Sequence, residues 1–449
     1  MESRMIFDKA TWESFAEGFT VYDVAISSPT RFWLELVEQT DSPHRDPLPR
    51  TRFLSVNLKK PLGERFYFHE FGHFRFSQLA FNKGARVEVV AVDLGGHVYC
   101  YAADGDQEES RIATQLEGSD LVSAVTGIFR IQESLYAVAT DRRIFQRVNP
   151  GEWREITKGV GGIPVDKRSL TGDAGMNFGF RSISAFASED VYAVGGEGDV
   201  WHFDGTRWTQ LPFPSNELLY TVCCAGDGNV YITGNMGSLW VGRKDRWKRL
   251  AQGTFSVPFK DTAWFAGRLW CGSDYGLWVL QDGKLEVPDQ PAAVRTACGV
   301  IDISPDGTTM LTASPTGAAL YDGNKWELLF SNSAFAVPSE KASERQQLGR
   351  GGERLTTHDG MQELLDVIGN DGPEASLHAL ADPAKLDLPA LRAHSWLLLV
   401  NAISAQSGWA EYSQVVNRLV ELGADPDAIE QESGLTPRAL AQSMGLPLA

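Results

Sequence analysis

Histidine, cysteine and basic residues are all scarce in this chain of 449 residues. It holds 8 His and 5 Cys, and its 41 Lys+Arg stand against 58 Asp+Glu, which gives a net charge of −17. A protein that binds nucleic acid needs a basic surface to meet the phosphate backbone, so this balance excludes nucleic acid as the partner. It is compatible with a basic protein partner, which an acidic surface would attract.

The few cysteines are scattered. None has the C-x-x-C spacing of a zinc or redox site, and only Cys223 and Cys224 are adjacent. Thiols this few are typical of a cytosolic protein in which they stay reduced. We expect Cys223 and Cys224 to lie on an inner strand and to be buried as small apolar side chains.

Long apolar runs are also missing. The N-terminal stretch MESRMIFDKATWESF has no apolar core of signal-peptide length. No uninterrupted run reaches the roughly 18 residues that a membrane-spanning helix needs. We therefore expect a cytoplasmic protein with no membrane partner.

Motifs for the common catalytic chemistries are absent too. The chain has no G-x-x-x-x-G-K-[ST] phosphate loop and no G-x-S-x-G nucleophile turn. The eight histidines are spread thinly along the sequence. We expect no catalytic residues and no cofactor.

One histidine motif does stand out. The letters HEFGH at residues 69–73 fit the H-E-x-x-H pattern, and on this motif the chain resembles zinc peptidases. The resemblance implies a helix on which His69 and His73 bind zinc while Glu70 acts as general base on the bound water. The extended pattern would need a third histidine where this chain has Leu79.

The surroundings of the motif favour strands over a helix. Aromatic residues alternate along residues 66–76 with a period of two, and Gly72 interrupts the run. We interpret the stretch as a hairpin whose tip carries two surface histidines, with no metal bound. A zinc-dependent hydrolase that uses His69, Glu70 and His73 remains the alternative from the enzyme class.

A repeat fills the first three quarters of the chain. Runs such as VYAVGGEGDVWHF (191–203) and VYITGNMGSLWVG (230–242) pair two β-prone segments across a turn rich in Gly and Asp. Four of the six such pairs are followed by a turn and a Trp-bearing segment, as in GTRWTQL (205–211). Four short strands per unit of about 40 residues is the signature of β-propeller blades. The equivalent positions of the pairs are Val90, Tyr136, Tyr192, Tyr231, Trp270 and Met310, and Tyr99, Phe145, Trp201, Trp240, Trp278 and Leu320.

The fold predicted for residues 1–330 is therefore a mainly β, seven-bladed propeller, with six or eight blades as alternatives. It resembles the architecture of the Kelch and WD-repeat families. Residues 1–50 are also β-like, and we expect them either to complete the last blade or to form an extra one. The Gly-rich insertion 157–179 is expected to form a long loop on one face.

The C-terminal part has a different pattern. Residues 331–358 are polar and are interpreted as a linker, and residues 359–449 carry helical patterns. The stretch 414–445 resembles ankyrin repeats, with Gly423 ending one helix. The acidic candidates for partner binding lie within it. They are Asp425, Asp427, Glu430 and Glu432.

The two predicted parts are both scaffolds that bind other proteins. An acidic propeller with degenerate helical repeats is similar to the immunity proteins that bacteria keep beside secreted toxins. The resemblance implies a non-catalytic protein that binds and neutralises a basic toxin. A signalling or assembly adaptor is the alternative among binding proteins.

Overall fold

The structure is a computed structural model in which the chain divides into two compact units, Met1–Ala336 and Val337–Ala449. In the first unit it describes residues 5–39, 49–74, 76–84, 86–116, 122–164, 179–251 and 258–335. In the second unit it describes residues 364, 372–381, 386, 391–392, 395, 398–399, 402, 412–428 and 436–438. Each unit is considered by itself.

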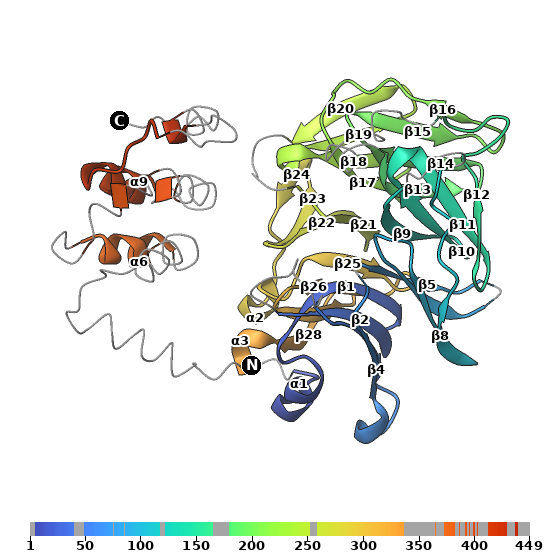
Figure 1. The fold of residues 1–449 in the computed structure, drawn as a ribbon, viewed down its shortest axis with the longest axis horizontal. Helices are drawn as coiled ribbons and strands as arrows, with labels where there is room; N and C mark the ends of the chain where they lie inside the picture. Colours follow the sequence, from blue (N-terminus) through green and yellow to red (C-terminus); the bar gives the residue numbers. More distant parts are fainter. Residues whose placement is uncertain are drawn as a thin grey trace. The chain divides into compact units, whose positions relative to one another are not determined.

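The first unit is a β-propeller. Within the described residues, seven antiparallel sheets of four strands each follow one another along the chain and surround a common axis (Figure 1). Blade one contains β1 (Phe19–Ser28), β2 (Arg31–Glu38), β3 (Thr51–Asn57) and β4 (Phe66–Phe71), and blade two contains β5 (Gln78–Asn82), β6 (Glu88–Val92), β7 (Val98–Ala102) and β8 (Gly105–Glu109). Blade three contains β9 (Val125–Ile131), β10 (Ser134–Ala139), β11 (Arg143–Asn149) and β12 (Glu152–Glu155). Blade four contains β13 (Phe180–Ala187), β14 (Asp190–Gly195), β15 (Asp199–Phe203) and β16 (Trp208–Gln210).

The remaining blades continue the same meander. Blade five contains β17 (Leu219–Cys224), β18 (Val230–Gly234), β19 (Leu239–Arg243) and β20 (Arg246–Ala251). Blade six contains β21 (Asp261–Phe265), β22 (Arg268–Ser273), β23 (Gly276–Gln281) and β24 (Lys284–Glu286). Blade seven contains β25 (Val300–Ile303), β26 (Met310–Ser314), β27 (Gly317–Tyr321) and β28 (Trp326–Ser331). Short helices flank the ring. They are α1 (Lys9–Phe15), α2 (Ala292–Arg295) and α3 (Asn332–Phe335).

The repeat predicted from the sequence is confirmed. Both sets of equivalent positions fall on the second and third strands of blades two to seven, which pair antiparallel. Their side chains form the cores between neighbouring blades. Trp201, Trp240 and Trp270 are all buried, so the Trp-rich strands supply packing, as expected. The seven-bladed prediction is correct.

The prediction for residues 1–50 is wrong in part. The strands β1 and β2 neither complete the last blade nor form an extra one, because they pair with β3 and β4 as the inner half of blade one. A shorter segment does reach the last blade. The backbone N–H groups of Ile6 and Phe7 donate to the carbonyls of Leu328 and Leu329 on β28. The N-terminus therefore joins the last blade to the first.

The hairpin predicted for residues 66–76 is also wrong. The strand β4 ends at Phe71, and the next strand, β5, begins at Gln78 in a different blade. Residues 72–77 are thus a connection between two blades. The alternation of aromatic residues correctly indicated a strand, and this strand pairs with β3.

The two faces of the ring differ in their loops. Because the four strands of a blade are antiparallel, the fourth ends on the side where the first begins. Connections between blades and turns between second and third strands therefore share one face, which we name the loop face, and the other is the turn face. The loop face carries the longest connections, which are 39–50, 110–124, 156–179 and 287–299. The insertion predicted at 157–179 starts and ends on this face, and its residues 165–178 lie outside the described residues.

The second unit is helical where it is described. The helices α6 (Gly372–Ala379) and α9 (Tyr412–Glu421) contribute to a core of buried residues that includes Leu380, Leu398 and Leu419. Gly423 follows α9 with a φ of +100°, the left-handed conformation of a helix-ending glycine. The predicted linker, residues 331–358, begins inside α3 and otherwise lies mostly outside the described residues.

Candidate functional site

The inner strands form a hydrogen-bonded belt around the axis. At each of the seven junctions in the described ring, a polar side chain on one inner strand bonds to the inner strand of the next blade. In ring order the donors and acceptors are Leu79 N to Asp23, Ile128 N to Gln78, Thr126 to Phe180 O, Val222 N to Ser182, Thr262 to Thr221, Ile301 N to Asp261 and Ile26 N to Asp302. The belt fixes the blades against one another, because a backbone group has a partner across six of the junctions and two hydroxyls bond across the seventh.

Three of these belt side chains are carboxylates. Burial raises the pKa of Asp23 to about 8, although the N–H groups of Leu79 and Val24 act to lower it. Burial likewise raises the pKa of Asp261 to about 7 and raises that of Asp302. The axis therefore holds acidic groups with a reduced tendency to ionise.

One arginine crosses the axis to these carboxylates. Arg130 on β9 in blade three donates from Nη2 to the carbonyl oxygen of Ile303 on β25 in blade seven, at 2.6 Å. The same nitrogen lies 3.8 Å from Oδ1 of Asp302. Because the two strands belong to blades that are not neighbours, the contact spans the ring. Arg130 thus supplies a positive charge that acts to lower the pKa of Asp302, against the burial that raises it.

Exposed aromatic side chains gather next to the loop face. Tyr22 on β1 is 37% exposed, and its ring centroid lies 6.1 Å from that of Phe76, which is 49% exposed. Asp274, in the turn between β22 and β23, is close enough to raise the pKa of the Tyr22 hydroxyl, which burial raises more. Tyr275 follows it in the chain and is 75% exposed. We name Tyr22, Phe76, Asp274 and Tyr275 the aromatic cluster.

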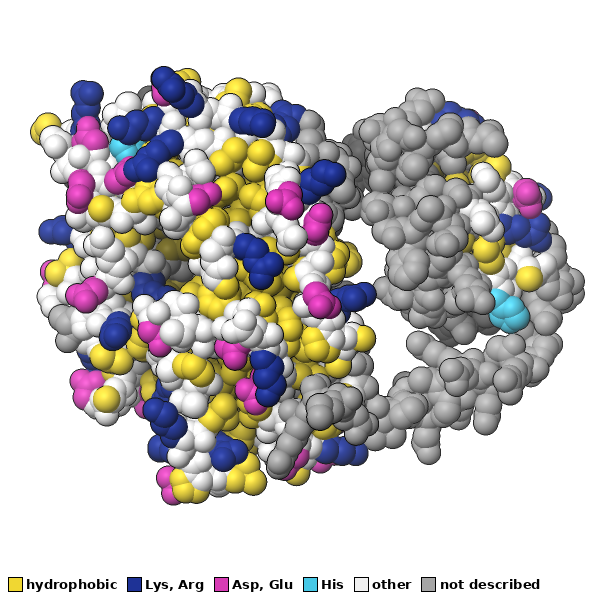
Figure 2. Space-filling view, turned by 180° about the vertical axis from the view of Figure 1, so that it is seen from behind, with side chains coloured by type: hydrophobic (Ala, Val, Ile, Leu, Met, Phe, Trp, Pro, Cys, Tyr) yellow, Lys and Arg dark blue, Asp and Glu magenta, His cyan; other side chains and the backbone are white. Residues whose placement is uncertain are grey.

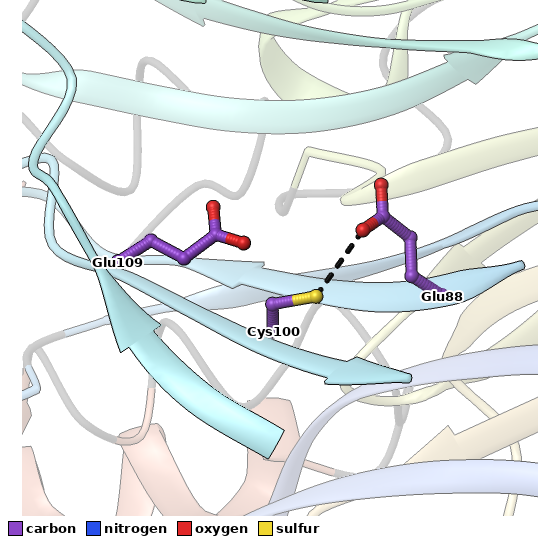
Figure 3. A group of neighbouring side chains, drawn as sticks. All are labelled: Glu88, Cys100 and Glu109. Atoms are coloured by element: carbon purple, nitrogen blue, oxygen red, sulfur yellow. Dashed lines mark hydrogen bonds between the residues drawn. The ribbon is translucent and has the colours of Figure 1, made fainter. Parts of the chain in front are cut away.

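A second group of acidic side chains lies between blades two and three. Glu88, Cys100 and Glu109 place their ligand atoms within 4.8 Å of one another, the spacing of a metal site, and Figure 3 shows the thiol directed at Glu88. Arg147 occupies the space between the carboxylates. Its guanidinium donates to both oxygens of Glu88 and both of Glu109 at 2.7–3.0 Å.

This group is a buried ion cluster and does not fit a metal. Side chains of Glu88, Glu109 and Arg147 are 3%, 2% and 3% exposed. Arg147 lowers the pKa of Glu88 against the effect of burial, which acts to raise it, so the carboxylate stays ionised beside its arginine. Burial raises the pKa of the Cys100 thiol, and the Glu88 carboxylate raises it further. A protonated thiol and a bound guanidinium leave no coordination sphere for a cation.

The residues of the H-E-x-x-H motif lie on or just after β4, which is a strand. Neighbouring side chains on a strand point to opposite faces, so Glu70 is directed away from His69. Glu70 pairs with Arg50 and Arg52 at 2.6 and 2.8 Å. His69 pairs with Asp106 at 2.9 Å, and His73 lies beyond the strand end. The helical geometry that a zinc hydrolase requires is contradicted at these residues.

The acidic candidates of the second unit are divided. Asp425 and Asp427 are described, and Asp427 pairs with Arg438 at 2.7 Å, which lowers the pKa of its carboxyl. Asp425 accepts a hydrogen bond from the backbone N–H of Asp427. Glu430 and Glu432 lie outside the described residues. The two that are described therefore stabilise a turn and remain partly exposed.

A cavity of about 440 Å³ opens beside blade three. It is lined by residues 115–116, 157–159 and 162–164 together with Arg143 and Glu155. These two side chains pair with each other at 2.8 Å. Lys158 adds a further positive charge to the lining, and residues 165–178, which follow in the chain, lie outside the described residues.

The surface charge of the propeller is mixed. Figure 2 shows acidic and basic side chains interspersed over the face in view, with hydrophobic side chains gathered toward its middle. The net negative charge of the chain is thus not collected into one patch there. Among the described residues, no helix is both long and apolar enough to cross a membrane. All five cysteines are free thiols, as expected.

The sequence did not reveal the aromatic cluster or the belt. A signal for the belt was present, because Asp23 and Asp302 each interrupt an otherwise apolar strand. The aromatic cluster had no such signal, since Tyr22 and Asp274 lie 252 positions apart and only ring closure joins them.

The fold and the belt around the axis define the chain as a seven-bladed β-propeller protein. It is 30% identical over 234 residues to the immune protein Tsi7 of Pseudomonas aeruginosa, a match that spans 51% of this chain and 72% of that protein. The chain belongs to the family of this immune protein. The matched residues outnumber those of the second unit, Val337–Ala449, so the match includes part of the propeller.

Two further comparisons add little. No family model matches the chain, so the ankyrin resemblance of the second unit gains no support. The solved structure of YCF48 from Cyanidioschyzon merolae is 14% identical, with a TM-score of 0.45 over 68% of this chain and 96% of that one. The propeller assignment rests on the sheets of the chain itself.

Proposed function

We propose that this chain is an immunity protein that binds a protein toxin and neutralises it without catalysis. Its membership in the family of the immune protein Tsi7 carries the proposal. The geometry supports it, because the ring is a rigid scaffold whose long connections share one face, where binding residues are commonly placed. The motif that pointed to an enzyme lies on a strand and pairs with neighbouring side chains.

The toxin partner is basic in this proposal, and the complex forms in the cytoplasm. The chain has a net charge of −17, which would speed its encounter with a positively charged protein. Its free thiols suit a reducing compartment. Nucleic acid and membrane are not partners. The second unit is proposed to be a short ankyrin-like stack, for which Gly423 and the bond from Arg438 N to Pro426 O are the supporting contacts.

Titration of toxin activity tests the proposal. The probe is the product of the gene next to the one for this chain, purified and assayed for its toxic activity as full-length chain is added. Neutralisation by binding gives a linear loss of activity that ends at one chain per toxin, at toxin concentrations well above the dissociation constant. Loss of activity at a small fraction of that amount would show catalysis. A lasting full activity at excess chain would contradict the immunity role and leave an adaptor role.

A further inference from the structure

The aromatic cluster is held in place by two irregularities of the backbone. Tyr22 lies at a β-bulge, because the register of β1 with β2 shifts between Val21 and Asp23. A bulge inserts an extra residue and turns its side chain away from the regular direction of the strand. Tyr22 thereby presents its ring beside Phe76, which belongs to the connection 72–77 between blades one and two.

Phe76 has a strained backbone conformation. Its φ is +51°, in the left-handed region that bulky residues avoid. Most other non-glycine residues of positive φ in the described chain stand in tight two-residue turns of the turn face, where the hairpin demands it. These are Gln132, Lys244, Ala266 and Asp282. Asp141 and Arg142 stand in a similarly short turn between β10 and β11. Among the described non-glycine residues, only Phe76 adopts this conformation in a connection between blades. Strain of this kind is retained where it serves a function.

Carboxylates lie near the hydroxyl of Tyr22. Asp274 is half-exposed and pairs with Lys260, itself half-exposed, at 2.6 Å. Glu35 lies opposite Asp23 on β2 and next to Tyr22, and it is fully buried. Its Oε1 accepts a hydrogen bond from Ser77, while its Oε2 has no hydrogen-bond partner within the described structure. Because Glu35 is fully buried, Asp274 is the carboxylate of this group that a partner can reach.

We propose that the aromatic cluster receives an arginine or lysine side chain of the toxin. A cation of this shape lies on the faces of Tyr22 and Phe76, while the half-exposed carboxylate of Asp274 accepts its hydrogen bonds. The chemistry of the cluster selects this occupant, because aromatic faces and carboxylates together recognise a guanidinium or ammonium group. The inference rests on the proposed function and names the kind of side chain of the toxin that the propeller recognises.

Replacing Phe76 with glycine distinguishes a role of its ring in binding from a role in stability. In Phe76→Gly the ring is lost but the left-handed backbone becomes favourable, so the free energy of unfolding should stay level or rise. The dissociation constant for the toxin should rise at least tenfold. Gln132→Gly is the matched control, because it relieves the same φ on the turn face and should leave the affinity unchanged.

A second pair of variants tests the charge. Asp274→Asn removes one carboxylate from the aromatic cluster, and Asp282→Asn removes one from the turn face of the same blade. The affinity of Asp274→Asn for the toxin should fall at least fivefold at low salt, and the loss should shrink at 0.5 M NaCl. Asp282→Asn should match the unmodified chain under both conditions.

The measurement is isothermal titration of each full-length variant with the purified neighbouring toxin, made catalytically inactive. Weaker binding by Phe76→Gly and Asp274→Asn alone would support the inference. Binding by all four variants with unchanged affinity would overturn it while leaving the immunity role intact. Failure of the unmodified chain to bind would overturn both.

Discussion

The carboxylate of Asp302 accepts a hydrogen bond from the backbone N–H of Ile26 at 2.8 Å, across 276 positions of sequence. This contact joins the inner strand of the last blade to that of the first. It closes a belt that the other six junctions continue, and Arg130 reaches Asp302 from across the axis. A ring closed in this way has no open sheet between its first and last blades.

Asp302→Ala should therefore weaken the whole propeller. The N–H of Ile26 would lose its partner inside the ring, which costs about 1–3 kcal/mol of unfolding free energy. Chemical unfolding followed by tryptophan fluorescence measures the change. Glu327→Ala is the control, because its side chain is exposed on the same blade, and a loss within about 0.5 kcal/mol is expected. Equal stability of the two variants would show that the closing contact is dispensable.

Arg147→Ala should be more damaging still. It leaves Glu88 and Glu109 buried side by side without their shared guanidinium. Breaking one partner of a buried ion cluster costs about 3–5 kcal/mol. Arg154→Ala, on the exposed face of the neighbouring strand β12, serves as the control and should cost little. Thermal unfolding distinguishes them, and a Tm for Arg147→Ala as high as for the control would contradict the cluster's role.

Stability should fall as the pH rises through neutrality. The pKa of Asp23 is raised to about 8 and that of Asp261 to about 7 in the folded chain. Both carboxyls thus keep protons that the unfolded chain releases near pH 4, so their contribution is present below that pH and is lost as the pH rises through 7 to 8. Urea unfolding at pH 6 and 8.5 should show the decrease.

The double variant Asp23→Asn/Asp261→Asn separates these groups from the rest. Each Asn keeps an oxygen that can accept the backbone N–H of the next blade but cannot ionise. The decrease between pH 6 and 8.5 should be smaller than in the unmodified chain, with the remainder due to Glu35 and Asp302, whose pKa values burial also raises. If stability fell as much in the double variant as in the unmodified chain, Asp23 and Asp261 would not be the groups that cause the decrease.

Gly423→Ala should disturb the second unit alone. The φ of Gly423 is +100°, and an added Cβ would lie 2.7 Å from Nε of Arg392. Hydrogen exchange in α6 and α9 should become faster, while the propeller amides keep their protection. Gly228→Ala provides the comparison, since a Cβ there meets nothing within 4 Å and only the φ of +83° is unfavourable. Faster exchange throughout the propeller in Gly423→Ala would contradict the division into two units.

The sequence predicted the blades because their second and third strands are joined by short turns. Val90 and Tyr99 in one blade have the same separation as Tyr192 and Trp201 in another, so the blades can be aligned by inspection. Blade one escaped this pattern, since its second and third strands are separated by residues 39–50. Its first two strands lie before that gap, and they were therefore expected to complete the last blade or to form an extra one.

The site was less predictable than the fold. The aromatic cluster depends on a bulge at Tyr22 and on the return of the chain after six blades, and neither leaves a local pattern. The H-E-x-x-H letters were misleading for the opposite reason. They are a strong local pattern, but pairing with β3 makes a strand of residues that the motif would place on a helix.

The most direct test of the account is the growth of cells that express the neighbouring gene with and without this chain. The account predicts that the toxin alone arrests growth and that co-expression of the unmodified chain restores it. Phe76→Gly should restore growth only at higher expression levels. Arrest that persists at full expression of the soluble, folded chain would contradict the central claim that this propeller is an immunity protein.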